Sequence, residues 1–357
     1  MFAKFDTPAV MRICLTLAIG AVSGFFANRV GLPLPWMLGP MIGTTICALL
    51  HLPLKAPGKM RTFVIPVIGV LLGAGFSPEI FSNIAGWIAT LVLLPPFIAA
   101  SAWISYIFFR RVGGYDPVTA FFSAMPGGLN EMLILGEEAG GDLRHIALAH
   151  AMRILVVITC VALFYGFALG VSANGSGRPF TTFSDLSPTD GVLMLLCAVA
   201  GVWGAKRLSL PAAGMLGPMI LSAALHLGEI VVVAPPTALV IVAQIIIGCT
   251  IGCRFLGAPL AVVGRDLVLG AGASIVMIAV AVVFAVMASF ITASPLGQTF
   301  LAYSPGGLTE MSLLALAMDQ DVAYVSTAHV ARIVLVIFAT PYIFRMIRGL
   351  LPVKDRS

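Results

Sequence analysis

Charged residues are scarce in this sequence. Lys, Arg, Asp and Glu together make up only 10% of the 357 residues, whereas 60% are hydrophobic and the mean hydropathy is +1.06. A soluble globular domain needs far more polar surface than this composition supplies. The composition therefore excludes a soluble domain and indicates a polytopic membrane protein. The net charge of +5 is then explained by basic cytoplasmic loops, without a nucleic-acid partner.

Sequence signatures of catalysis and of metal binding are also missing. The chain has no nucleotide-binding glycine loop, no Ser-His-Asp constellation and no His/Cys spacing of the kind that holds a metal. Its six cysteines lie inside apolar segments, and the Cys249-x-x-x-Cys253 pair has neither zinc-knuckle nor redox-motif spacing. We therefore expect the cysteines to be small core residues. We predict no enzymatic activity and no cofactor.

The alternation of polar and apolar residues that marks barrel strands is weak throughout. Instead, apolar runs of about 17–25 residues, long enough to cross a bilayer as helices, follow one another almost from end to end. We predict an all-α polytopic membrane protein with about ten transmembrane helices and two interrupted segments. The helices are expected at 9–27, 34–50, 62–76, 86–109, 146–171, 191–205, 213–227, 236–252, 267–291 and 329–347, and the interrupted segments at 118–136 and 297–318.

One polar sequence occurs twice. Residues 123–132 read SAMPGGLNEM and residues 302–311 read AYSPGGLTEM, an offset of 179 residues from Pro126 to Pro305. Self-similarity of this kind is the signature of a duplication. We predict two membrane repeats, residues 1–171 and 191–357, joined by a linker rich in Ser, Gly, Pro and Thr at 172–190. The same offset relates three further pairs: Asp142 and Asp321, His150 and His329, and Arg153 and Arg332.

Two apolar motifs recur as well. Met37-Leu-Gly-Pro-Met41 returns as Met215-Leu-Gly-Pro-Met219, and Gly69-x-x-x-Gly73 returns as Gly248-x-x-x-Gly252. Small residues at this spacing let helices approach closely in a membrane. We therefore expect the glycines to serve helix packing.

The orientation of the two repeats depends on whether the interrupted segments cross the membrane. If each dips in and returns, sixteen of the 20 Lys and Arg residues are cytoplasmic, two are outside, and Arg153 and Arg332 lie within helices. Full crossings give twelve against six. Because basic residues concentrate on the cytoplasmic side, the re-entrant arrangement is favoured. It leaves five crossings per half, places both termini in the cytoplasm and inverts the second repeat, as in many secondary transporters.

The Pro-Gly-Gly sequences predict where each segment breaks. Proline removes a backbone donor, and two glycines permit a sharp change of direction. Backbone groups that lose their helical partners must be buried in protein or line a wet cavity. We predict that these groups bind a solute or ion, with a simple packed kink as the alternative. The six backbone positions are Pro126, Gly127, Gly128, Pro305, Gly306 and Gly307.

A carboxylate follows each break inside an apolar segment. Glu131 and Glu310 fall in the first turn of the next half-helix, with Asn130 and Thr309 beside them. The helix dipole favours a carboxylate there. Because ionisable groups within membrane segments usually mark a pathway, we predict that both glutamates bind the coupling cation or proton. A buried structural ion pair with the repeated arginines is the alternative.

His150 and Arg153, like His329 and Arg332, are three residues apart on one helix face. Each pair is predicted to point into the same cavity, where the arginines balance the glutamates or hold an anionic solute. A packing role for the histidines is the alternative. A metal site made of both Glu and both His is a further alternative, although the neighbouring arginines oppose it. The repeated aspartates precede the following helix and are expected to be surface or capping residues.

Three features are shared with a known family: the doubled Pro-Gly-Gly-Leu-x-Glu-Met, the His-x-x-Arg about eighteen residues downstream of it, and the Met-Leu-Gly-Pro-Met repeat. With them the sequence resembles the bacterial membrane AbrB duplication family over both halves. The small DNA-binding transition-state regulator of that name is a different protein. Members of the membrane family carry labels such as regulator of AidB expression and ammonia monooxygenase. The fold is similar to that of inverted-repeat antiporters and anion transporters, and the resemblance implies the bacterial inner membrane.

Together these observations predict a secondary transporter that moves a small solute, coupled to an ion or proton, by alternating access. Its expected partners are the lipid bilayer, the solute and the coupling ion, and a homo-oligomer is left open. Two alternatives also stay open. One is a membrane-embedded regulator that affects gene expression indirectly, and the other is a metal-dependent monooxygenase subunit.

Overall fold

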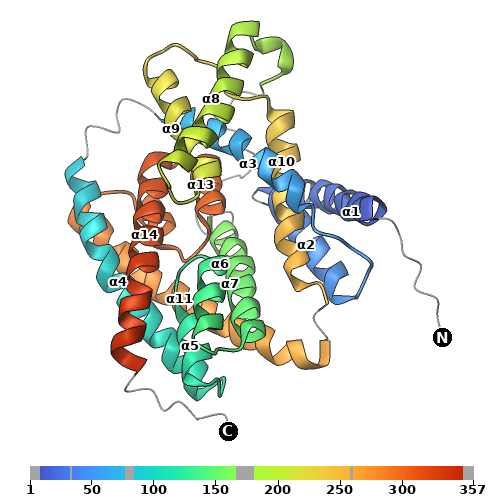
Figure 1. Ribbon diagram of the computed structural model, residues 1–357. Coiled ribbons are helices and arrows are strands. Elements are labelled where there is room, and N and C mark those ends of the chain that lie inside the picture. Colours follow the sequence, from blue (N-terminus) through green and yellow to red (C-terminus); the bar gives the residue numbers. More distant parts are fainter. Residues whose placement is uncertain (1–8, 33, 77–83, 166–180, 258–259, 349–357) are drawn as a thin grey trace, which may run out of the picture. The chain divides into compact units, whose positions relative to one another are not determined.

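The computed structural model describes residues 9–32, 34–76, 84–165, 181–257 and 260–348, and every regular element in these ranges is a helix (Figure 1). The predicted all-α, multi-pass class is therefore confirmed, while the inverted and re-entrant arrangement stays a prediction. Within the described ranges, seven helical stretches are long and apolar enough to span a membrane: Ala9–Arg29, Gly86–Arg111, Leu143–Leu163, Pro188–Arg207, Thr237–Phe255, Gly264–Thr292 and Val322–Met346.

The chain divides into two compact units, and each draws on both halves of the sequence. In the first unit, α1 packs on α2 and α8 on α9, whereas α3 packs on α9 and α10 on α2. Each half of the sequence thus packs against the other. The helices of this unit are α1 (Ala9–Arg29), α2 (Pro35–Leu49), α3 (Gly58–Gly73), α8 (Pro188–Arg207), α9 (Ala213–Leu227) and α10 (Thr237–Gly252), with short 3-10 turns η3 (Phe183–Asp185) and η4 (Cys253–Phe255).

Glycines allow α3 to approach α9 closely and α10 to approach α2 closely, as predicted. A Cβ atom added to Gly69 of α3 would lie 2.5 Å from the carbonyl oxygen of Met215 on α9. A Cβ atom on Gly248 of α10 would meet the carbonyl oxygen of Met37 on α2 in the same way. Only glycine fits at either position, and the two halves make this contact at equivalent places.

The second unit contains both interrupted segments. Each interrupted segment is a pair of short helices with a Pro-Gly-Gly sequence between them. The first pair is α5, with 8 residues, and α6, with 10, and the second pair is α12, with 8, and α13, with 10. Both predicted breaks are therefore present. The elements of this unit are α4 (Ile84–Arg111), α5 (Pro117–Ala124), α6 (Leu129–Glu138), α7 (Leu143–Leu163), α11 (Leu260–Thr292), α12 (Leu296–Tyr303), α13 (Leu308–Ala317) and α14 (Val322–Arg348).

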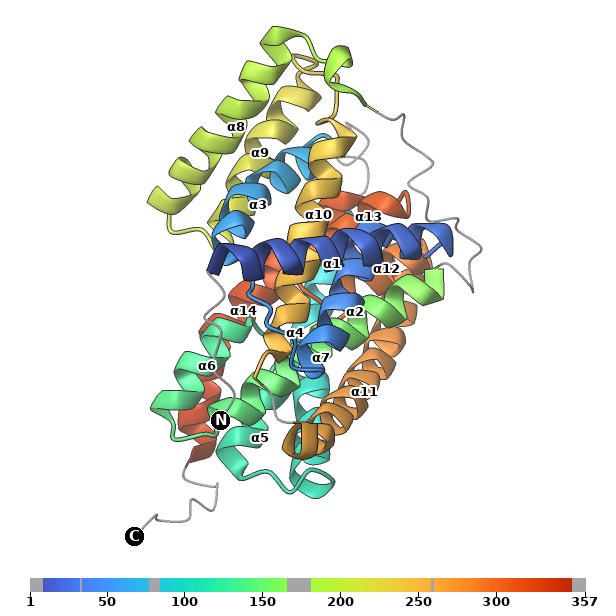
Figure 2. The same cartoon turned by 90° about the vertical axis from the view of Figure 1, so that its right-hand side faces the viewer.

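In the second unit α4 contacts α5, α12 and α14, and α12 packs against α14. Helix α7 lies beside α11 (Figure 2), where a Cβ on Gly270 would come within 2.8 Å of the Cβ of Met152. These neighbours hold the broken segments between long helices.

Capping residues, rather than hydropathy, set two helix starts. Helix α8 begins at Pro188, inside the predicted linker, because the Ser187 hydroxyl accepts from the Asp190 amide at 3.1 Å and donates to its carboxylate at 2.7 Å. Helix α14 begins at Val322, ahead of the predicted start at 329, and the Asp321 carboxylate accepts from the Tyr324 amide. Residues 172–180 of the predicted linker and residues 166–171 of the predicted helix 146–171 lie outside the described ranges.

The prediction for the cysteines is wrong at two positions. Cys197, Cys249 and Cys253 are buried, but Cys14 and Cys160 are exposed on helix surfaces. A membrane helix can present a small apolar side chain to lipid as readily as to a core, so hydropathy alone did not separate these cases. All six thiols are free.

Candidate functional site

At the first break, the backbone carbonyls are held by a buried arginine. Helix α5 ends at Ala124, and Met125 continues in an extended conformation. From α7, Arg153 donates to the carbonyl oxygen of Met125 at 2.7 Å and to that of Gly127 at 2.7 Å. The guanidinium therefore satisfies acceptors that the broken helix can no longer pair.

At the second break, the same contacts recur at equivalent positions. From α14, Arg332 donates to the carbonyl oxygen of Ser304 at 2.6 Å and to that of Gly306 at 2.5 Å. Its side chain is only 3% exposed. Charged hydrogen bonds of this kind are stronger than neutral ones, so each arginine fixes the shape of its break.

The glutamates occupy the third position of their half-helices and fold back over the N-terminus. A Cβ added to Gly128 would collide with the Glu131 carboxylate, and one on Gly307 would collide with that of Glu310. The second glycine of each pair is therefore required for the carboxylate to reach the start of its helix, where the backbone dipole stabilises negative charge.

Neither glutamate has a partner of opposite charge. Within the described ranges, Glu131 and Glu310 form no ion pair and no hydrogen bond, because Arg153 and Arg332 contact the carbonyls of the breaks. The alternative of a Glu–Arg ion pair is not what the structure shows. Glu310 is 7% exposed, whereas Glu131 is half-buried.

One of the two repeated histidines contacts a broken segment. His150 is fully buried, and its Nε2 lies 2.9 Å from the carbonyl oxygen of Phe122, near the end of α5. Because a carbonyl can only accept, Nε2 carries the hydrogen. His150 and Arg153 thus both contact the backbone around the first break from α7. His329, the counterpart on α14, is also fully buried.

Helix α14 contacts both breaks. Arg332 holds the second break, and Val336, one turn later, packs so close to the first that a Cβ on Gly127 would lie 2.7 Å from its Cγ1. Phe121, Met125 and Met132 share one buried apolar cluster with Val336. The structure therefore brings the two breaks to neighbouring positions along one helix.

The remaining predicted positions are placed as follows. Pro126 and Pro305 are buried, and Thr309 is half-buried on the first turn of α13. Asn130 lies on α6, and its side chain is outside the described part of the structure. Among the described residues, no three His, Cys, Asp or Glu side chains are grouped so as to hold a metal ion.

Comparison with known proteins identifies the family. A family model described as "Transition state regulatory protein AbrB" matches residues 36–348, a range that covers both breaks. The chain belongs to the AbrB family. It is 27% identical to "Uncharacterized protein YhjN" of Bacillus subtilis (strain 168), covering 94% of this chain and 92% of that one. It is also 27% identical to "Putative regulator AbrB" of Escherichia coli (strain K12), covering 93% and 94%. No solved structure matches.

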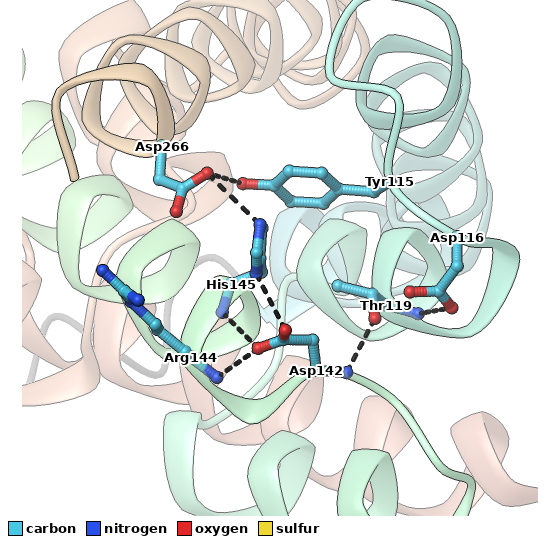
Figure 3. Close-up of polar contacts among 7 residues, drawn as sticks. All are labelled: Tyr115, Asp116, Thr119, Asp142, Arg144, His145 and Asp266. Carbon is cyan, nitrogen blue, oxygen red and sulfur yellow. Dashed lines mark hydrogen bonds and ion pairs between the residues drawn. The ribbon is translucent and has the colours of Figure 1, made fainter. Parts of the chain in front are cut away.

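This AbrB-family chain has a second polar cluster, which the repeat analysis missed (Figure 3). Asp142 caps α7, as predicted, by accepting from the amides of Arg144 at 2.9 Å and His145 at 3.3 Å. Its other carboxylate oxygen lies 3.2 Å from Nδ1 of His145, whose Nε2 lies 3.6 Å from the carboxylate of Asp266 on α11. The hydroxyl of Tyr115 donates to the same Asp266 oxygen at 3.0 Å.

Burial and neighbouring charges shift two groups in this cluster. Desolvation, with the nearby Asp266 carboxylate, raises the pKa of Tyr115, so its hydroxyl stays protonated as a donor. Partial burial raises the pKa of Asp142, but hydrogen bonds from His145 and Arg144 outweigh it and the net pKa is lowered. Asp266 is 3% exposed, so the cluster places a carboxylate deep in the unit.

These residues are not part of the set that both halves of the sequence share. At an offset of 179 residues, His145 corresponds to Tyr324, and Asp266 corresponds to Trp87. A search for polar positions shared by both halves therefore excludes them. Both His145 and Asp266 are ionisable residues in the first two turns of apolar helices, and that is the signal by which the sequence could have shown them.

Proposed function

We propose that this AbrB-family protein is a proton-coupled secondary transporter of the bacterial inner membrane that moves a small solute by alternating access. One observation carries the proposal: each helix break holds a glutamate that has no ion-pair or hydrogen-bond partner among the described residues. Ionisable side chains within membrane segments usually mark a pathway. Each glutamate lies beside a broken helix, where a coupling ion would meet its carboxylate.

The arrangement favours a proton over a metal cation as the coupling ion. Cations such as Na⁺ and Ca²⁺ are bound by several oxygens, including backbone carbonyls. Here the carbonyls of Met125, Gly127, Ser304 and Gly306 already accept hydrogen bonds from arginines. The guanidinium charges also oppose a second cation nearby. A proton needs only the carboxylate.

Flux measurements in vesicles test this function. The purified protein is reconstituted with a pH-sensitive dye inside, and a panel of small organic anions, amino acids and alkali cations is added under a pH gradient. We expect at least one solute to collapse the gradient, and Glu131→Gln or Glu310→Gln to reduce that flux at least ten-fold. Glu137→Gln and Glu138→Gln, which alter exposed residues of α6, serve as matched controls. Unchanged flux in the double Glu131/Glu310 variant rejects the proposal.

The name of the Escherichia coli relative, a regulator, supports a second candidate, a membrane-embedded regulator of gene expression. This reading expects a deletion strain to show altered transcription while the reconstituted protein moves none of the panel. Restoration of transcription by the Glu131/Glu310 double Gln variant separates the two functions, since a transporter acting through its flux would fail to restore it.

A further inference from the structure

We propose that four basic residues of the first unit bind the headgroup of an anionic phospholipid. These residues, which we call the basic end, are Lys59 and Arg61 on α3 and Lys206 and Arg207 on α8. The site is separate from the two breaks and does not depend on the proposed transport function. Its ligand carries a negative phosphate beside acyl chains, and such a ligand needs positive charge next to an apolar surface.

Helix packing brings the two basic pairs to the same end of the unit. Helices α3, α8 and α9 pack on one another (Figure 2). Helices α3 and α9 run in the same direction, because Gly69 contacts Met215 and, one turn later, a Cβ on Gly73 would meet the carbonyl oxygen of Met219. Two turns earlier in this register, the first turn of α3 lies level with residues 208–212, which join α8 to α9. The start of α3 is therefore beside the end of α8.

The four side chains have no carboxylate to balance them. Among the described residues, none of the four side chains forms an ion pair or a hydrogen bond. Lys59, Lys206 and Arg207 are exposed and Arg61 is half-buried. The guanidinium of Arg207 lies over the ring of Trp203, 5.6 Å from its centroid. Like charges gathered at one place raise the local positive potential, which attracts an anion.

Lys59 and Arg61 are placed where a helix alone would disfavour them. They lie in the first turn of α3, which contains no acidic residue and has no side-chain cap at Pro57. The helix dipole is positive at this end, and uncapped amides there are donors for an anion. Lys206 and Arg207 end α8, where the dipole favours bases. Helix stability therefore explains the bases of α8 but not those of α3.

The acidic residues of this unit lie away from the basic end. On the described parts of α1–α3 and α8–α10 and their connections, the acidic residues are Asp185, Asp190 and Glu229. Asp190 is in the first turn of α8, and Glu229 follows the end of α9. Because α8 and α9 are consecutive packed helices, both positions are at the opposite end of this pair from Arg207. The same two helices thus present negative charge at one end and positive charge at the other.

An apolar surface continues from the basic end along α8. Helix α8 is long and apolar enough to span a membrane, so its last turn reaches the bilayer surface. Leu195, Val199 and Trp203 follow one another at four-residue spacing and are exposed, as is Phe63 on α3. A tryptophan at the end of a spanning helix is typical of the headgroup region. Acyl chains can lie on this stripe while the phosphate meets the bases, which favours a phospholipid over free phosphate.

The end of α1 provides a matched comparison. There the guanidinium of Arg29 lies over the ring of Phe25, 5.1 Å from its centroid, and both side chains are exposed. The connection that follows, residues 30–34, contains no Lys or Arg. Arg29 thus has the aromatic neighbour of Arg207 without the additional bases. We expect the end of α1 to lack preference for an anionic headgroup.

Native mass spectrometry tests the proposal on the full chain. The protein is mixed in detergent with equal amounts of phosphatidylglycerol and phosphatidylcholine, and the ratio of the two bound lipids is measured. A base at a membrane surface strengthens binding to anionic lipid about five-fold. We expect phosphatidylglycerol to be retained preferentially, and the double Lys206→Gln/Arg207→Gln variant to lower the ratio by at least about five-fold. Arg29→Gln should keep the wild-type ratio. Equal retention of both lipids by the wild-type protein, or an unchanged ratio in the double variant, overturns the proposal.

Tryptophan fluorescence in lipid nanodiscs locates the lipid without altering any base. We expect brominated phosphatidylglycerol to quench the wild-type protein more than brominated phosphatidylcholine, and Trp203→Phe to remove this difference. Added salt should weaken the preference, because exposed charges are screened. Equal quenching by the two lipids contradicts the proposal. Inorganic phosphate at the concentration of the lipid should leave the quenching unchanged, and loss of the preference would identify a site for free phosphate instead.

Discussion

In the first break Arg153 donates to the carbonyls of Met125 and Gly127, and in the second Arg332 donates to those of Ser304 and Gly306. The backbone contacts of the two breaks are thus the same, and both glutamates fold over a glycine. The surroundings differ: Glu310 is buried and Glu131 is half-buried.

A second difference lies at the helix that follows each break. On the first turn of α7, His145 lies 3.6 Å from the carboxylate of Asp266 on α11, whereas on the first turn of α14 Tyr324 contacts the ring of Trp87 on α4. The comparison teaches that the contacts needed to stabilise a broken backbone are the same at both breaks, whereas the ionisable groups nearby are not.

The largest expected effect tests the shared contacts. Replacing Arg332 by Gln leaves two buried carbonyls with at most one donor, and we expect unfolding free energy to fall by about 2–5 kcal/mol. Arg332→Lys should be nearly as harmful, because an ammonium group lacks the planar fork that reaches both acceptors. Thermal unfolding in detergent measures both. The comparison predicts a similar loss for Arg153→Gln, and a melting temperature unchanged by either Gln variant contradicts the assigned role.

A smaller effect is expected from the glycines beneath the carboxylates. In Gly307→Ala the new methyl group displaces the Glu310 carboxylate, and burial leaves that side chain little room to move. Gly128→Ala should be milder, because the half-buried Glu131 can turn outward. We expect solute-coupled proton flux to fall more in the first variant, with stability lowered by about 1 kcal/mol in each.

Gly204→Ala is the matched control for these variants. Nothing lies within 4 Å of a Cβ at this position on α8, and alanine favours a helix interior. We expect unchanged flux. Equal flux in Gly307→Ala and Gly204→Ala would show that transport does not require the Glu310 carboxylate to lie at the start of its helix.

The smallest expected effects distinguish the two capping aspartates, because the pKa of Asp142 is lowered and the pKa of Asp321 is raised. The pKa of Asp142 is lowered by hydrogen bonds that outweigh its partial burial, so its contribution is present above its unfolded pKa and is lost as pH falls. The pKa of Asp321 is raised by burial, so its contribution is present at low pH and is lost as pH rises through its folded value. At pH 7 we expect Asp142→Asn to lower the melting temperature slightly and Asp321→Asn to leave it unchanged or raise it.

Both changes should stay below about 1 kcal/mol, because Asp142 is half-exposed and solvent screens its interactions. Melting curves between about pH 4 and 8 measure them. A fall in melting temperature of the same size for both variants at pH 7 would show that the two caps do not differ.

Much of the architecture follows from local sequence. Apolar run length predicted the long helices, and the two Pro-Gly-Gly sequences predicted both breaks, because proline and paired glycines end a helix wherever they occur. Helix starts were less accurate, as at Pro188 and Val322, since capping side chains decide them. The sequence predicted Asp142 and Asp321 as surface or capping residues, and both accept from amides of the helices that follow.

The partners of the ionisable groups could not be predicted in this way. Glu131 and Arg153 were an equally reasonable ion pair in the sequence, and only the course of α7 shows that the guanidinium faces carbonyls. His145 and Asp266 are 121 positions apart, and Tyr115 and Asp266 are 151 apart. No local pattern joins such residues.

Composition and duplication by themselves determined that this chain is helical, membrane-embedded and broken twice, because these properties depend on run length, backbone chemistry and repetition along one dimension. Only the tertiary structure decided which charges meet. A hydrogen bond depends on the distance and direction between two atoms, and helix packing brings together residues whose separation along the chain carries no such information.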